Sequence, residues 1–277
     1  MRGSILIACG GAAARMVSGV SGRVGMDIVY VNADKTIEKT EDGLQILVRP
    51  IEETMEEKHS GLVESMRGFR VAVILVALGG TSGSAIVPYI IDYAREAGCI
   101  PITVLTVPFG QEQDRRDTAF RVMRNLIPRS DRTVLFDLQT LVENESTRKV
   151  NQVMNVSSNV LAFMLKNIAD LSEGPILSTL SRHIYTYSYT TGLDPADAVG
   201  RALDGGVFPT DTEAGMPVVM VSSGYNDYEI QQITNAVVDR IGSLPDFVYR
   251  KDQDDTRVLV FLPVVAVTSS PTASRDG

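Results

Sequence analysis

The chain has little of several residue types on which common functional sites depend. Its two cysteines, Cys9 and Cys99, are too few for a disulfide framework and suit a reducing cytoplasm. Its two histidines, His59 and His183, have no metal-binding neighbours, so no zinc site is expected. Positive charge is in deficit, with 26 Lys and Arg against 34 Asp and Glu. This balance argues against general binding to nucleic acid or to anionic membranes.

Long hydrophobic runs are also absent. No apolar segment approaches the roughly 20 residues that a membrane-spanning helix needs. The opening residues 1–4 lead into a short strand and do not have the pattern of a signal peptide. There is no internal repeat. We therefore expect a cytoplasmic globular protein, and 277 residues are enough for two subdomains.

The most informative stretch is residues 71–85, where a continuous apolar strand runs into a loop of small residues and then into a helix. The backbone N–H groups at a helix N-terminus are unpaired, and the helix dipole favours negative charge there. The segment is neither a Walker A loop nor a GxGxxG motif. It favours a phosphate site over a plain strand-to-helix turn. The residues that would contribute are Gly79, Gly80, Ser82, Gly83 and Ser84.

Apolar strands alternate with helices throughout the first half. This order predicts an α/β fold with a doubly wound parallel sheet, in which ligands bind at the carboxyl ends of the strands. The expected strands are 5–8, 28–31, 45–48, 71–78, 102–107 and 133–136. The expected helices are 12–18, 51–66, 86–97 and 113–126.

The second half has a different pattern. A helix at 148–171 is apolar over most of its circumference, which predicts that it is buried between two layers. A smaller α+β unit follows at 181–268, with a helix at 194–203 whose N-cap is Asp194. Its other expected elements are strands 218–222, 247–249 and 258–267 and helix 228–241, with strand 247–249 pairing with the last strand.

With these elements in place, the chain resembles the tubulin/FtsZ family over nearly its whole length. The phosphate loop of that family, GGGTGTG or GGGTGSG, aligns without a gap with Gly79-Gly80-Thr81-Ser82-Gly83-Ser84-Ala85. Pro88 matches the family's helix proline, and Pro108-Phe109 matches its PF. The resemblance implies a nucleotide-binding domain at 1–147, a central helix at 148–173 and a C-terminal α+β domain at 174–268. Residues 269–277 are expected to be a disordered tail.

The resemblance also implies which residues contact a guanine nucleotide. Gly10 and Gly11 match the first loop, and Asn32 with Asp34 matches the family's NTD near phosphate and metal. Glu112 and Arg116 match residues near the ribose and guanine, and Asp137 replaces a base-proximal Asn. Met154 replaces a stacking aromatic residue, and Ser158 the polar residue at the base edge. The full predicted set is Gly10, Gly11, Asn32, Asp34, Gly79, Gly80, Thr81, Ser82, Gly83, Ser84, Glu112, Arg116, Asp137, Met154 and Ser158.

Several of these matches have a plainer structural interpretation. Glu112 and Arg116 are also an i, i+4 pair at the start of a helix. Asn32 and Asp34 are residue types that shape turns. Met154 is of a type that fills gaps in cores.

The chain also departs from the family. Its first loop continues as Ala12-Ala13-Ala14 where the family has GxN, and residues 40–65 contain no counterpart of the γ-phosphate loop. In the family, an NxDxxD loop of one subunit supplies acids to the nucleotide of the next. The aligned residues here are Thr179, Ser181 and Ile184, and neither Ser181 nor Ile184 orients water as a carboxylate does. Asp170 and Glu173 lie nearby but close the central helix before that loop.

These observations predict an atypical cytoplasmic tubulin/FtsZ-like protein with a reduced guanine-nucleotide site and little or no GTP hydrolysis. Its ligand would be GTP or GDP, with the need for magnesium left open. One alternative is a vestigial site in a structural or adaptor protein that self-associates or binds a partner. A second is a pocket reused for another phosphorylated small molecule. No catalytic residue and no metal ligand is predicted, and neither nucleic acid nor a membrane span is expected.

Overall fold

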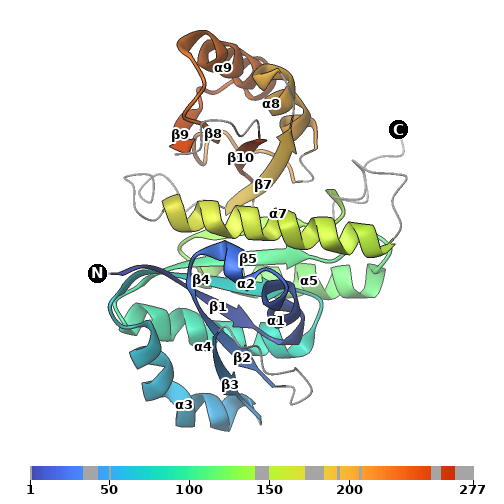
Figure 1. Ribbon diagram of the computed structural model, residues 1–277. Helices are drawn as coiled ribbons and strands as arrows, with labels where there is room; N and C mark the ends of the chain where they lie inside the picture. Colours follow the sequence, from blue (N-terminus) through green and yellow to red (C-terminus); the bar gives the residue numbers. More distant parts are fainter. Residues whose placement is uncertain are drawn as a thin grey trace.

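A computed structural model describes residues 2–33, 43–49, 51–140, 150–171, 184–191, 194–205, 208–250 and 257–265. Across the described residues, one ten-stranded sheet has the order β3-β2-β1-β4-β5-β6-β7-β10-β8-β9. Helix α7 (Val150–Leu171) crosses the middle of the molecule, with the first six strands below it and the C-terminal elements above it in Figure 1. The predicted long central helix is therefore confirmed.

The first six strands are all parallel, which confirms the parallel sheet predicted for the first half. Apart from the exposed edge strand β3, their apolar runs are buried on both faces. In β4, for example, every residue except Arg70 is buried. The strands are β1 (Arg2–Cys9), β2 (Asp27–Asn32), β3 (Leu44–Leu47), β4 (Phe69–Ala77), β5 (Ile100–Val107) and β6 (Thr133–Asp137).

Alternate residues of these strands enter two separate cores, because successive side chains of a strand point to opposite faces. Val71, Val73 and Leu75 pack in the core that includes α1 and α7, whereas Ala72 and Ile74 pack in the core that includes α3, α4 and α5. The sheet is therefore covered on both sides. The helices of this half are α1 (Gly11–Ser18), α2 (Ser21–Val24), α3 (Ile51–Met66), α4 (Thr81–Glu96), α5 (Gln113–Leu126) and the 3-10 helix η1 (Ile127–Arg129).

Helix α4 begins at Thr81, not at residue 86 as the sequence pattern predicts. The predicted loop of small residues is thus the first turn of the helix. Ser84 donates a hydrogen bond to the carbonyl of Gly80, 2.9 Å away, which is an i to i−4 contact inside this turn. Glycine and serine residues are weak helix formers, so the apolar periodicity alone could not reveal the earlier start.

The C-terminal elements extend the same sheet. Asp194 caps α8 as predicted, accepting a hydrogen bond from the Asp197 amide at 2.9 Å. Strand β7 joins the halves by pairing parallel to β6 and antiparallel to β10. The elements are β7 (Ile184–Thr191), α8 (Pro195–Asp204), β8 (Val218–Ser222), α9 (Asp227–Ile241), β9 (Asp246–Arg250) and β10 (Arg257–Pro263).

One predicted pairing is wrong. The sequence prediction paired strand 247–249 with the last strand, but β9 pairs parallel with β8. Strand β10 has no free edge for β9, because β7 and β8 occupy its two sides. Strand β7 itself was not predicted, since its alternating Tyr, Thr and Ser residues do not form an apolar run. The proposed domain boundaries stay a prediction, and the expected tail at 269–277 lies outside the described residues.

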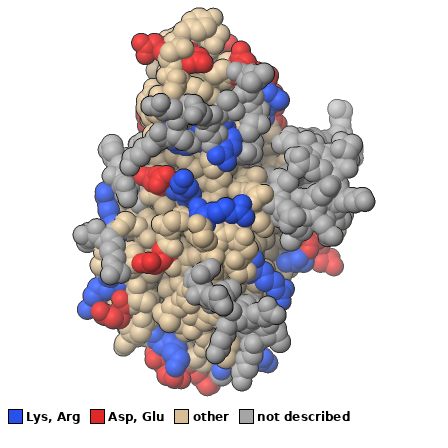
Figure 2. Space-filling view, viewed as in Figure 1, with Lys and Arg blue, Asp and Glu red and all other residues tan. Residues whose placement is uncertain are grey.

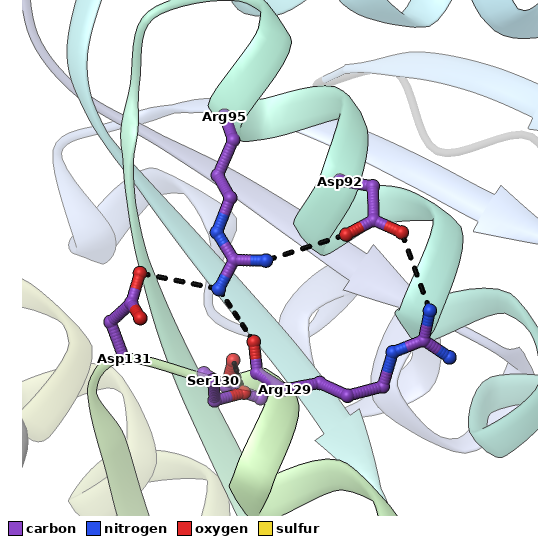
Figure 3. A network of polar contacts seen from close by, with 6 residues as sticks. Asp92, Arg95, Arg129, Ser130 and Asp131 are labelled. Atoms are coloured by element: carbon purple, nitrogen blue, oxygen red, sulfur yellow. Dashed lines mark hydrogen bonds and ion pairs between the residues drawn. The ribbon is translucent and has the colours of Figure 1, made fainter.

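Figure 2 shows Lys and Arg interspersed with Asp and Glu on the visible face. A network at the amino ends of the strands ties α4 to the turn before β6 (Figure 3). Arg95 contacts Asp92 at 3.4 Å and Asp131 at 3.2 Å, and it donates to the carbonyl of Arg129 at 2.6 Å. Such exposed ion pairs contribute about 0–1 kcal/mol each. Within the described residues, no helix combines the length and apolarity needed to cross a membrane.

Phe163 of α7 joins the central helix to the C-terminal strands. The guanidinium carbon of Arg257 lies 3.7 Å from the centre of its ring, and that of Arg250 lies 5.1 Å away. We expect Phe163→Leu to lower the free energy of unfolding by about 1–2 kcal/mol, because both cation–π contacts are lost. Phe163→Tyr keeps the aromatic face and is the control. Chemical denaturation measures both, and equal stability of the two variants would contradict the expectation.

Candidate functional site

Four loops meet at the carboxyl edge of the parallel sheet, where β1, β4, β5 and β6 end. The first two are joined by contact between their backbones. A Cβ atom on Gly10 would lie 2.7 Å from the amide nitrogen of Gly83, and a Cβ on Gly83 would lie 2.7 Å from the carbonyl oxygen of Cys9. Gly10 also has a φ of +84°, which L side chains rarely adopt. Both positions therefore require glycine.

This contact places the N-termini of α1 and α4 beside each other. Their N-cap residues, Gly10 and Gly80, provide no side-chain cap, and neither helix has an acidic residue in its first turn. In contrast, α3, α5, α8 and α9 each have an acidic first turn, and Asp194 and Asn226 cap α8 and α9. The positive ends of two helix dipoles thus converge, and neither first turn carries an acidic side chain, an arrangement that favours an anion.

Gly80 differs from the other glycines of this edge. Apart from its own chain neighbours, no atom of the described residues lies within 4 Å of a Cβ built on it. Its φ of −103° and ψ of 164° are extended values open to any residue. Gly80 is therefore not needed for packing, and the space beside it is open at the N-terminus of α4.

The other two loops form the adjacent wall. Gly79, with a φ of +84°, abuts this wall, since a Cβ on it would lie 2.9 Å from both the carbonyl oxygen of Arg115 and Cγ of Pro108. Further along, the Gly110 amide donates to Oε1 of Gln139 at 2.7 Å. Gly110 and Gln139 could not be predicted from the sequence, because their contact joins two loops and leaves no local pattern.

The charged residues predicted for this wall are bonded to one another. Arg116 donates to both carboxylate oxygens of Asp137 at 2.8 Å, and both residues are 2% exposed. Arg116 also donates to the carbonyl of Pro108 at 2.5 Å. Glu112 forms an ion pair with Arg115. The structure therefore brings Glu112, Arg116 and Asp137 to the predicted edge. There, however, each is paired with another side chain of the same chain.

The remaining predicted contacts are distributed as follows. Thr81 is exposed at the start of α4, Ser82 is half-buried, and the Ser84 hydroxyl bonds within its own helix. Asn32 is 7% exposed at the end of β2, and Ser158 is half-buried on α7. Asp34 and the Met154 side chain lie outside the described residues, as do Glu173, Thr179 and Ser181.

Of the residues linked to hydrolysis, the structure describes Ile184 and Asp170, and both lie at the amino ends of the strands, away from this edge. Ile184 is the first residue of β7. Asp170 lines a cavity of about 480 Å³ at the amino ends of the strands, together with Ser4, Ser21 and Asp27.

Among the described residues, no group of three or more His, Cys, Asp or Glu side chains is arranged to hold a metal ion. Cys9 and Cys99 are buried, and burial raises the pKa of both thiols. Because the thiolate is the reactive form, these cysteines are core residues of low reactivity.

The comparisons with known proteins agree with this architecture. A model of the tubulin/FtsZ family GTPase domain matches residues 41–146. The cell division protein FtsZ of Haloferax mediterranei is 28% identical over 193 residues, which are 63% of this chain and 51% of that protein. The matched segments are 34% to 51% of the length of such curated relatives, so the chain spans about half of them or less.

Two solved structures share the fold. An empty FtsZ dimer from M. jannaschii has a TM-score of 0.76 at 17% identity, and the match covers 95% of this chain and 88% of that one. A GTPγS-bound protofilament of CetZ2 from Haloferax volcanii has a TM-score of 0.75 at 16% identity, and the match covers 98% and 94%. At these identities the likeness shows the fold.

The glycine contacts predict that one added methyl group lowers stability at Gly10 and Gly83 but not at Gly80. We expect Gly83→Ala and Gly10→Ala each to lower the free energy of unfolding by about 1–3 kcal/mol, because the new Cβ meets the backbone of the opposite loop. Gly80→Ala, the matched control, adds its Cβ in open space and should change stability by about 0.5 kcal/mol or less. Thermal and chemical denaturation give the three values. A loss at Gly80 equal to that at Gly83 would contradict the geometry.

Proposed function

The chain belongs to the tubulin/FtsZ family, and on that premise we propose that it binds a guanine nucleotide at the carboxyl edge of its parallel sheet and hydrolyses GTP slowly or not at all. The observation that carries the proposal is the pair of uncapped helix N-termini at Gly10 and Gly80. Backbone amides of this kind bind phosphate without any basic side chain. The net charge of −8 is therefore no obstacle.

The bound nucleotide would lie across the four loops. Its phosphates would face the first turns of α1 and α4, where the space beside Gly80 is open. Its ribose and base would lie along the wall formed by the Gly110 and Gln139 loops. The GTPγS in the CetZ2 structure supports a guanine nucleotide as the ligand class for this chain.

Weak hydrolysis follows from the residues at the positions of the family's acids. Ser181 and Ile184 stand there, and a hydroxyl or an alkyl group neither orients nor activates water as a carboxylate does. The segment aligned with the γ-phosphate loop includes β3 and α3, with no AGANP-like sequence. Loss of a positioned water-activating group costs about 10²- to 10⁴-fold in rate.

Another phosphorylated small molecule is the second candidate ligand. It is favoured by the buried pairing of Arg116 with Asp137, which engages the groups expected near the ribose and guanine. Mass spectrometry of the small molecules released when the purified protein is denatured separates the two. Release of GDP or GTP supports the nucleotide, release of a different phosphate ester supports the second candidate, and release of neither favours a structural or adaptor role.

Substitution of Gly80 tests whether the phosphates bind at the N-terminus of α4, because an acidic residue there should raise stability and lower GDP affinity. Gly80→Asp would cap α4 and raise the free energy of unfolding by about 0.3–1 kcal/mol. The same carboxylate would lie where a phosphate is proposed, so the affinity for GDP should fall by at least about tenfold. Gly80→Asn supplies an uncharged cap of similar size and is the control for charge. Calorimetry measures both affinities, and unchanged GDP binding by Gly80→Asp would remove the phosphates from α4.

Hydrolysis and assembly are tested together. We expect phosphate release from GTP with magnesium to stay near background at every protein concentration, because the positions aligned with the acids carry none. Light scattering should show no polymer that forms with GTP and disappears as GTP is consumed. A turnover that rises with protein concentration and collapses in Asp170→Ala or Glu173→Ala would show that other carboxylates perform this role.

A further inference from the structure

We propose that Arg116 and Asp137 form a positioning pair that holds the base-side wall of the site, and that neither side chain touches the ligand. Family resemblance alone assigns both residues to the nucleotide. The pair is a property of the folded chain, whereas its consequence for ligand binding rests on the proposed function.

Both terminal nitrogens of the Arg116 guanidinium bond to Asp137, whereas its buried Nε has no hydrogen-bond partner among the described residues. Nη1 and Nη2 each donate to a separate carboxylate oxygen at 2.8 Å, which is the bidentate geometry of the strongest ion pairs. The side chains are 3% and 1% exposed. Nη1 also reaches the carbonyl of Pro108 at 2.5 Å, and the guanidinium carbon lies 5.7 Å from the centre of the Phe120 ring.

The pair connects the two loops of the wall. On one side Arg116 binds the carbonyl of Pro108, at the start of the loop between β5 and α5. On the other side Asp137 accepts from the Gln139 amide at 2.9 Å, and its carbonyl accepts from the Thr140 hydroxyl at 2.7 Å. The Gln139 side chain then returns to the Gly110 amide at 2.7 Å. These bonds set the distance between the loops.

Burial makes it costly for Arg116 to leave this pair. A ribose hydroxyl is neutral, so it cannot replace the negative charge that a buried guanidinium requires. If Arg116 turned to a phosphate, Asp137 would remain buried without a counter-charge. The ligand therefore meets a neutral wall that the pair shapes, and its charged recognition rests on the N-termini of α1 and α4.

Arg115 is an internal control for how easily a reagent reaches an arginine side chain of α5. It is the neighbour of Arg116 in α5, its side chain is 48% exposed, and it pairs with Glu112 at the surface. We expect the arginine reagent phenylglyoxal to modify Arg115 and to leave Arg116 unmodified, both in nucleotide-free protein and with GDP present. Peptide mass spectrometry reports each site. Modification of Arg116 in nucleotide-free protein, with protection by GDP, would overturn the proposal.

A double-substitution cycle tests the pair and its role. Arg116→Gln and Asp137→Asn each leave one buried charge alone, and each should lower the melting temperature by on the order of 10 °C. The double substitution leaves a neutral amide pair and should recover at least about half of that loss. Additive losses would overturn the pairing. Arg115→Gln is the control and should change the melting temperature little.

Ligand binding distinguishes positioning from general structural support. Asp137→Asn should lower the affinity for GDP by about tenfold, because the base-side wall is disturbed. The affinity for inorganic pyrophosphate, which does not reach that wall, should stay within about twofold of the natural protein's. The double substitution should restore most of the GDP affinity. If the double variant is folded and its GDP affinity stays as low as that of Arg116→Gln, Arg116 contacts the ligand and the proposal is wrong.

The two proposals fail in distinguishable ways. If the natural protein binds neither GDP nor pyrophosphate, the proposed function fails. The labelling of Arg116 and the unfolding cycle need no ligand, so they still decide whether the pair exists. Labelling of the natural protein also decides the matter if a substituted protein does not fold.

Discussion

The close approach of two backbones at Gly10 and Gly83 is the constraint on which the site depends. Each glycine lacks a Cβ because the other loop occupies that space at 2.7 Å. The contact brings the first turns of α1 and α4 to one edge of the sheet, and because neither turn carries an acidic residue, their dipoles favour an anion there. The strands beneath it are buried on both faces, so the loops rest on a rigid base.

Backbone and side chains have separate roles at this edge. The groups available to a ligand's phosphates are main-chain amides, which need no basic side chain and survive a change of most loop residues. The charged side chains beside them are already paired, Arg116 with Asp137 and Glu112 with Arg115. If the proposed function holds, the phosphate-binding part of such a site can be kept while the side that faces the base and ribose changes.

Much of the fold could be predicted because its signals are local. The apolar runs of β1 to β6, the period of α7 and the Asp194 cap are each contained in a short segment, and the structure has all of them. The start of α4 was missed because glycine and serine suppress the helical signal. At the site, the local sequence pattern indicated the loop at residues 79–85, and the resemblance brought in Gly10, Gly11, Glu112, Arg116 and Asp137.

By itself, the sequence determined that the first half forms a parallel sheet, that a long helix follows it, and that small residues stand where β4 leads into α4. Only the tertiary structure decided that β9 pairs with β8, that β7 joins the two halves, and that Arg116 meets Asp137. The physical reason is that periodicity and capping act within one or two turns, whereas these contacts depend on which distant strand edge or side chain remains unoccupied. Arg116 and Asp137 are 21 residues apart, and only the adjacent ends of β5 and β6 bring them together.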